Sequence, residues 1–231
     1  IIGLGLSVVF LSSIFNDHIY AISSLFTGLI IVAIPMIIKQ EKDSIVGQYK
    51  NIIFTIIGVA IVALITYFNP AAGSEGGLNL SISGLSIGLG IFVFVAGMIA
   101  ISAMVLPGIS GSTLLLIFGL YTGIINAIKE FLTFNFEYVP VLVIFGLGVI
   151  TGIVSTIKII KIELKRHRSQ MIYLILGLMI GSLYAVFMGP TTLEVAKPAM
   201  TLSTFSFIYF IIGGAILLGL EKGKDLLEKR A

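Results

Sequence analysis

The sequence Leu106-Pro107-Gly108-Ile109-Ser110-Gly111-Ser112-Thr113 interrupts a long apolar segment, residues 84–128, with a helix stop followed by a helix start. Pro107 cannot continue a helix, and Gly108 and Gly111 permit backbone angles that other residues avoid. Ser112 or Thr113 is predicted to cap the helix that follows, residues 114–128. Since lipid does not tolerate irregular backbone, this break must be buried in protein or line a polar cavity.

The same break offers the chemistry of an anion-binding site. The first N–H groups of a helix have no partner within the helix, and the helix dipole favours negative charge beside them. The hydroxyls of Ser110, Ser112 and Thr113 add donors at that place. The alternative is an ordinary tight turn between two spanning helices. The sequence also leaves open whether residues 84–128 make two full crossings or a re-entrant hairpin.

The composition is that of a multi-pass protein of the cell membrane. Hydrophobic residues make up 58% of the 231 residues, charged residues only 11%, and there are 26 glycines. The mean hydropathy is +1.15. Apolar, glycine-rich runs of this kind are typical of spanning helices, so an all-α polytopic fold is predicted. The chain has no cysteine, which excludes disulfides and thiolate chemistry.

The hydropathy pattern predicts seven apolar segments, and the basic residues sort between their ends. The segments are residues 1–15, 21–38, 52–68, 84–128, 139–157, 171–188 and 205–220. Of the 14 basic residues, 12 lie in three stretches, 39–50, 158–168 and 222–230, and the other two are Lys129 and Lys197. The positive-inside rule places these three in the cytoplasm and the other connections outside. This sorting accounts for the net charge of +3, and no nucleic-acid partner is implied.

The predicted orientations indicate an inverted-topology repeat. Gly3-Leu4-Gly5 and Thr27-Gly28-Leu29 in one pair of spans match Gly146-Leu147-Gly148 and Leu176-Gly177-Leu178 in another, and the two pairs face opposite ways. The predicted parts are residues 1–68 (first repeat), 69–83 (external linker), 84–220 (second repeat with the motif) and 221–231 (cytoplasmic tail). Such repeats are typical of transporters with a site near the membrane midplane.

The first repeat has no motif unit of its own. The symmetry therefore predicts a further unit of about fifty or more residues, with a second break like the Pro-Gly motif, before Ile1. Ile1 also opens inside an apolar run without an initiator Met or a basic flank, which is unlike a signal peptide or a natural start.

One string carries a resemblance to a known family. Ala103-Met104-Val105-Leu106-Pro107-Gly108-Ile109-Ser110-Gly111-Ser112-Thr113-Leu114-Leu115-Leu116, followed by Gly119-Leu120-Tyr121, resembles the second signature of the polyprenyl-phosphate transporter family. The similarity extends over essentially the whole chain. Two features depart from the family: its first signature, Pro-Gly-x-Ser-Gly-Gly-Thr, is not in this sequence, and Thr122 stands where members often have Glu.

The resemblance implies a flippase for a lipid carrier. Members of the family include undecaprenyl-phosphate translocases, which return the carrier from the outer to the cytoplasmic leaflet for envelope polymer synthesis. The residues that would bind the lipid phosphate here are Pro107, Gly108, Ser110, Gly111, Ser112, Thr113 and Tyr121. A phosphate that crosses hydrocarbon needs donors in place of water, because an unpaired charge there is costly to desolvate.

Other classes of function stay as alternatives. The better rival is a small-anion or ion channel or carrier that uses the same helix N-termini. A membrane-embedded lipid phosphatase is disfavoured, because no Asp, Glu or His falls within an apolar span and the hydroxyls have no activating partner. His18 and His167 are predicted on opposite sides of the membrane, so neither a metal site nor a cofactor is expected. A purely structural subunit would not need a broken helix. The oligomeric state stays open.

Overall fold

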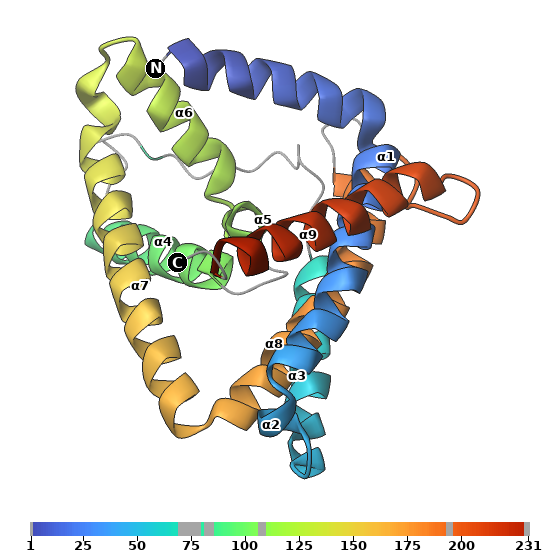
Figure 1. The fold of residues 1–231 in the computed structure, drawn as a ribbon. Helices are drawn as coiled ribbons and strands as arrows, with labels where there is room; N and C mark the ends of the chain where they lie inside the picture. The colour runs from blue at the N-terminus through green and yellow to red at the C-terminus, as the bar shows by residue number, and fades with distance from the viewer. Residues whose placement is uncertain (1, 69–79, 81–85, 106–109, 193–195, 229–231) are drawn as a thin grey trace. The chain divides into compact units, whose positions relative to one another are not determined.

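The computed structural model describes residues 2–68, 80, 86–105, 110–192 and 196–228, and every regular element in these ranges is helical. The predicted all-α membrane fold is confirmed. The elements, labelled in Figure 1, are α1 Ile2–Gln40, α2 Lys42–Ile45, η1 Tyr49–Asn51, α3 Ile52–Tyr67, α4 Ile87–Val105, α5 Gly111–Ile117, α6 Tyr121–Leu132, η3 Phe136–Tyr138, α7 Val139–Arg166, α8 Arg168–Met188, η4 Gly189–Thr192 and α9 Phe207–Glu228.

Five helical segments of the described chain are long and apolar enough to cross a membrane: His18–Gln40, Tyr49–Tyr67, Ile87–Val105, Phe136–Arg166 and Arg168–Thr192. The bent pair α5 and α6 would make a sixth. The predicted spans at residues 1–15 and 205–220 are not in this set. Residues 2–15 are helical within α1 and residues 207–220 within α9, and their crossing of the membrane stays a prediction.

The predicted break between the first two spans is present inside α1. His18 has φ −119° and ψ 29°, which is not helical, so α1 consists of two helices that meet there. The side chain of His18 is exposed. The external turn predicted at residues 16–20 is therefore a kink, and not a loop.

Two predicted charged connections are helical, which corrects the sequence analysis. The basic stretch 158–168 was expected as a loop, but α7 continues to Arg166 and only His167 separates it from α8. The tail predicted from residue 221 continues α9 to Glu228. Lys, Arg, Glu and Leu favour helix, and a helix need not stop where the hydrocarbon ends, so hydropathy marks the membrane border better than the helix end.

The chain divides into two compact units, which are described separately. The first unit contains residues 1–49 and 183–231, and the second contains residues 50–182. Neither coincides with a predicted repeat, because each unit brings together helices from both. The repeats are defined by order along the chain and the units by packing, so the repeat boundaries stay a prediction.

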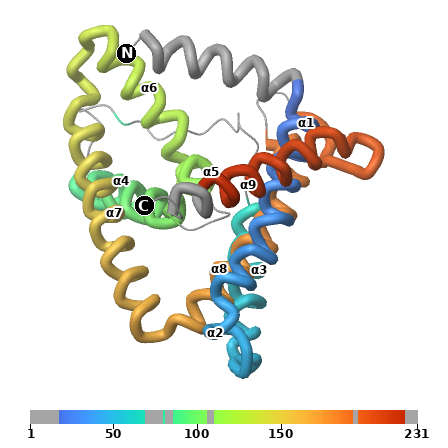
Figure 2. The backbone as a smooth tube through the Cα atoms, viewed as in Figure 1, coloured from blue at the N-terminus to red at the C-terminus, as the bar shows by residue number. Residues whose placement is uncertain are grey.

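Parallel helix pairs, each packed through reciprocal glycines, build both units. In the first unit, a Cβ atom on Gly28 of α1 would overlap the carbonyl oxygen of Phe210, and one on Gly213 of α9 would overlap that of Leu25. These residues hold the backbones of α1 and α9 in direct contact, and Figure 2 traces both helices. Small residues allow this close approach in membranes, where apolar burial alone gives little driving force.

The second unit contains two further pairs of this kind. In the pair α3 and α8, a Cβ on Gly58 would lie 2.7 Å from the carbonyl oxygen of Leu174, and one on Gly177 would overlap that of Thr55. In the pair α4 and α7, Gly97 faces Phe145 and Gly148 faces Phe94 in the same way. In all three pairs, each glycine packs on the residue three positions before the partner glycine.

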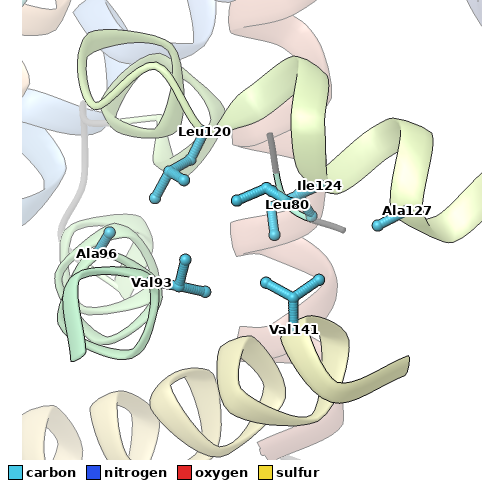
Figure 3. Close-up of a cluster of buried hydrophobic side chains, with 7 residues drawn as sticks. All are labelled: Leu80, Val93, Ala96, Leu120, Ile124, Ala127 and Val141. Atoms are coloured by element: carbon cyan, nitrogen blue, oxygen red, sulfur yellow. The ribbon is translucent and has the colours of Figure 1, made fainter. Parts of the chain in front are cut away.

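An apolar cluster of the second unit holds α6 against α4 and α7. Figure 3 shows its buried side chains pointing toward one another: Leu80, Val93, Ala96, Leu120, Ile124, Ala127 and Val141. Val93 and Ala96 come from α4, Leu120 precedes α6, and Val141 comes from the first turn of α7. This cluster fixes the position of the segment that follows the Pro-Gly motif.

Candidate functional site

The described part of the motif is at the start of α5. Pro107 and Gly108 lie outside the described residues. Ser110 immediately precedes α5, and Gly111, Ser112 and Thr113 form its first turn. Tyr121 is the first residue of α6, beyond a bend in the chain. The structure therefore brings the Ser, Gly and Thr positions together on one short helix and assigns Tyr121 to the next.

The helix after the motif begins earlier than predicted, which corrects the assignment of its cap. Ser110, and not Ser112 or Thr113, occupies the N-cap position, with φ −92° and ψ 128°. Its hydroxyl makes no capping hydrogen bond to the helix backbone. Instead its Oγ lies 2.7 Å from Oγ of Ser112, and both side chains are exposed. This pair of hydroxyls faces away from the helix core and is accessible to a ligand.

Close packing on α4 explains why residue 111 is a glycine. A Cβ at this position would lie 2.9 Å from the carbonyl oxygen of Ala100, so only glycine allows this approach. One turn later, Leu114 is buried with Ala100 and Ala103 in a second apolar cluster. The motif glycine thus serves to hold the broken segment against a spanning helix.

The predicted continuous helix over residues 114–128 is wrong. α5 ends at Ile117, α6 begins at Tyr121, and their axes differ by 109°. Gly119 has φ +67°, a left-handed conformation that glycine adopts at little cost and that ends α5. Buried Leu120 then anchors the bend in the apolar cluster. With seven residues, α5 is too short for its dipole alone to support anion binding, so the hydroxyls gain importance.

A polar contact that sequence reasoning missed lies between α4 and α7. The hydroxyl of Thr156 donates a hydrogen bond of 2.7 Å to Oγ of Ser102, which in turn donates to the carbonyl oxygen of Met98 at 2.6 Å. Thr156 follows Gly152 by one helical turn, and this spacing of small and hydroxyl residues is typical of helix interfaces in membranes. The spacing was visible in the sequence, but only the structure supplies the partner on α4.

The two histidines lie in different units. His18 is at the kink of α1, in the first unit, and His167 separates α7 from α8 in the second. Nδ1 of His167 lies 2.8 Å from Oε2 of Glu163, on an exposed surface. In the described ranges, no group of three or more His, Asp or Glu side chains could hold a metal ion.

Comparison with known proteins agrees with the resemblance carried by the motif. The family described as undecaprenyl phosphate translocase-like matches residues 1–204. A "Polyprenyl-phosphate transporter" of Staphylococcus aureus is 38% identical over 227 residues, which cover 96% of this chain and 76% of that protein. A protein of the same name from Vibrio cholerae is 28% identical, over 89% of this chain and 67% of its own length. No solved structure matches the chain.

These matches cover the spanning helices, the Pro-Gly motif and the bent segment α5–α6 together. The membrane class, derived above from composition and helix length, agrees with them. This multi-pass membrane protein belongs to the undecaprenyl phosphate translocase-like family of lipid transporters.

Proposed function

We propose that this protein transports polyprenyl phosphate and returns it from the outer to the cytoplasmic leaflet, where the carrier is reused in envelope polymer synthesis. The observation that carries this proposal is similarity over 96% of the chain to a protein named polyprenyl-phosphate transporter. The matched region includes the broken helix, which a purely structural membrane protein would not need.

The proposed phosphate site is the motif, residues Pro107, Gly108, Ser110, Gly111, Ser112 and Thr113, with Tyr121 as a further candidate. Ser110 and Ser112 support it because their oxygens lie 2.7 Å apart on an exposed surface. One hydroxyl donates to the other, so a proton of the pair stays available for a phosphate oxygen. Hydrogen bonds to a charged group are stronger than neutral ones, which suits a headgroup stripped of water.

We also infer the inverted repeat, and the glycine pairs support it. The predicted repeat matches Thr27-Gly28-Leu29 of α1 with Leu176-Gly177-Leu178 of α8, and it equates α3 with α9 as the span that follows each pair. The pair α1 and α9 then corresponds to the pair α8 and α3, and both show the same reciprocal packing. The positive-inside rule orients the two pairs in opposite directions. Each repeat contributes one helix to each pair, which is consistent with an inverted-repeat transporter.

The rival proposal, a small-anion or ion carrier, would use the same hydroxyls without binding a tail. An apolar groove on the pair α4 and α7 favours the lipid. This groove has a volume of about 450 Å³ and is lined by Ser86, Ile87, Gly90, Ile91, Phe94 and Ile144. A prenyl chain needs such an apolar surface open to the bilayer, whereas a small hydrated anion gains nothing from it.

Transport in liposomes tests the proposal. Undecaprenyl phosphate should be moved between leaflets, while undecaprenol and inorganic phosphate should not. Ser110→Ala and Ser112→Ala should each weaken binding of the lipid by about 1 to 3 kcal/mol, the cost of a lost hydrogen bond to a charged group. Thr151→Ala is the matched control, since that exposed hydroxyl bonds only to Leu147 of its own helix. Equal transport of all three compounds would overturn the proposal.

A further inference from the structure

A second groove opens at the end of α7 that the basic stretch occupies. α4 ends at Val105, whereas α7 continues to Arg166. The groove has a volume of about 410 Å³, and its apolar lining consists of Val105, Ile157, Ile160 and Leu164. The α7 members recur every three or four residues, so they share one face of that helix.

Basic side chains line the same groove. Lys161, Lys165 and Arg168 lie along it, and all three are exposed. Long basic side chains can lay their methylene stems on an apolar surface while the charged ends reach a headgroup. The acidic residue of this stretch, Glu163, does not line the groove and lies against His167.

We propose that this groove binds polyprenyl phosphate in the cytoplasmic leaflet, with the prenyl chain on the apolar lining and the phosphate against Lys161, Lys165 and Arg168. The inference rests on the proposed function and extends it, because it adds a site on the receiving side of the membrane. A lipid delivered by the motif would be held there before it leaves the protein.

The charges of the ligand and the groove are complementary. A phosphate monoester carries about −1.5 to −2 charges at neutral pH, more than the single charge of a phosphodiester lipid. Two or three adjacent cations therefore favour the monoester. The groove near Ser86 and Phe94, on the same helix pair, has no charged lining residue. The two grooves thus differ in the feature that would recognise a headgroup.

The positive-inside rule alone would also place lysines in this stretch, and the chain supplies a control for that explanation. Lys158 and Arg166 belong to the same basic stretch but do not line the groove. The double variants Lys161→Gln/Lys165→Gln and Lys158→Gln/Arg166→Gln remove the same charge from the same helix end. Only the first should affect a site in the groove.

Fluorescence in nanodiscs of neutral phosphatidylcholine tests the inference. Since the chain has no cysteine, Ile162→Cys gives a single attachment point for a solvent-sensitive dye beside the groove. Undecaprenyl phosphate should change the fluorescence, and Lys161→Gln/Lys165→Gln should weaken the apparent affinity about thirtyfold, given roughly fivefold per charge. The control pair should weaken it about threefold or less, because solvent screens charges that do not touch the ligand.

Three further arms make the outcome decisive. Lys161→Arg/Lys165→Arg should keep the affinity, since the charge is retained. Undecaprenol and phosphatidylglycerol should bind far more weakly than undecaprenyl phosphate. An equal loss of affinity in the groove variant and the control variant would overturn the inference. The lysines would then serve only to orient the protein in the membrane. An equal response to phosphatidylglycerol would overturn it too, since the groove would then be a general anionic-lipid surface.

The result is independent of whether the protein moves lipid between leaflets. If the dye responds as expected but wild-type liposomes show no transport, the proposed function fails and the binding site stands. If transport proceeds while the groove and control variants behave alike in both assays, the proposed function stands and the groove inference fails.

Discussion

The helix pairs α1–α9 and α3–α8 both bring two backbones into direct contact through glycines, but the side chains around these glycines differ. Gly28 and Gly213 make the contact in the first unit, and Gly177 and Gly58 make it in the second. Beside these contacts, the pattern differs. An added Cβ on Gly214 of α9 would meet the side chain of Val32 of α1, whereas one on Gly181 of α8 would meet the side chain of Val62 of α3.

This difference is an exchange of large and small residues across corresponding interfaces. The predicted repeat equates α1 with α8 and α3 with α9, and the valine lies on α1 in one pair and on α3 in the other. Each pair therefore contains one valine and one glycine at this level, on opposite partners. Packing conserves the total volume of a contact more strictly than the identity of either side chain. Comparison of the repeats residue by residue would miss this correspondence, because it exists only between partners.

The polar contacts of the two pairs also differ in detail. In the first pair, fully buried Ser24 accepts a hydrogen bond of 2.9 Å from the backbone N–H of Ser206. In the second, the hydroxyl of Thr55 donates to the carbonyl oxygen of Tyr173 at 2.8 Å. The first bond joins α1 to the residue just before α9, and the second joins α3 to α8, so both pairs are held by close packing and by hydrogen bonding.

The largest expected effect concerns the orientation of the two pairs. Single cysteines at Lys42 and Arg166 should be labelled by an impermeant reagent only in inside-out vesicles, and those at His18 and Thr201 only in right-side-out vesicles. The expected contrast is complete, because a membrane-impermeant probe reaches one face only. Labelling of His18→Cys and Lys42→Cys from the same side would contradict the inverted repeat. The two helix pairs would then be similar without being related by symmetry.

The next largest effect is a loss of stability when a glycine at the contact between two paired helices is replaced. Gly28→Val and Gly177→Val each place a Cβ against a backbone carbonyl of the partner helix, so the helices must separate. Each variant should lose about 1 to 3 kcal/mol of stability or more, as overpacking does. The melting temperature in detergent reports the loss. Gly146→Val is the control, because nothing lies within 4 Å of its added Cβ. Tolerance of one crossing variant but not the other would break the comparison.

A smaller effect should appear when one interface is converted to the pattern of the other. Gly214→Val should clash with Val32, whose Cγ2 lies 3.0 Å from an added Cβ. Val32→Gly should relieve this clash and leave the valine on α9, the predicted counterpart of α3, whose Val62 meets Gly181 in the other pair. The double variant should recover about 0.5 to 3 kcal/mol relative to the sum of the single variants. Additive losses in thermal unfolding would show that the two interfaces are not interchangeable.

Much of the fold and part of the site could be predicted from the sequence. The membrane class, most spanning segments and the break near Pro107 follow from local hydropathy and from proline and glycine chemistry. The close contact of Gly111 with Ala100 could not be predicted, because Ala100 belongs to another helix. The bend after Ile117 was missed although Gly119 was visible, since glycine occurs within many spanning helices without breaking them.

The sequence by itself determined that the chain is helical and membrane-embedded, where its charges cluster, and which family it resembles, because hydropathy, charge and short motifs are local properties. The tertiary structure decided which of the 26 glycines meet a partner backbone, which helices pair, and which lysines line a groove. Those properties belong to two helices at once. A glycine or lysine acquires its role only when folding brings a distant segment against it.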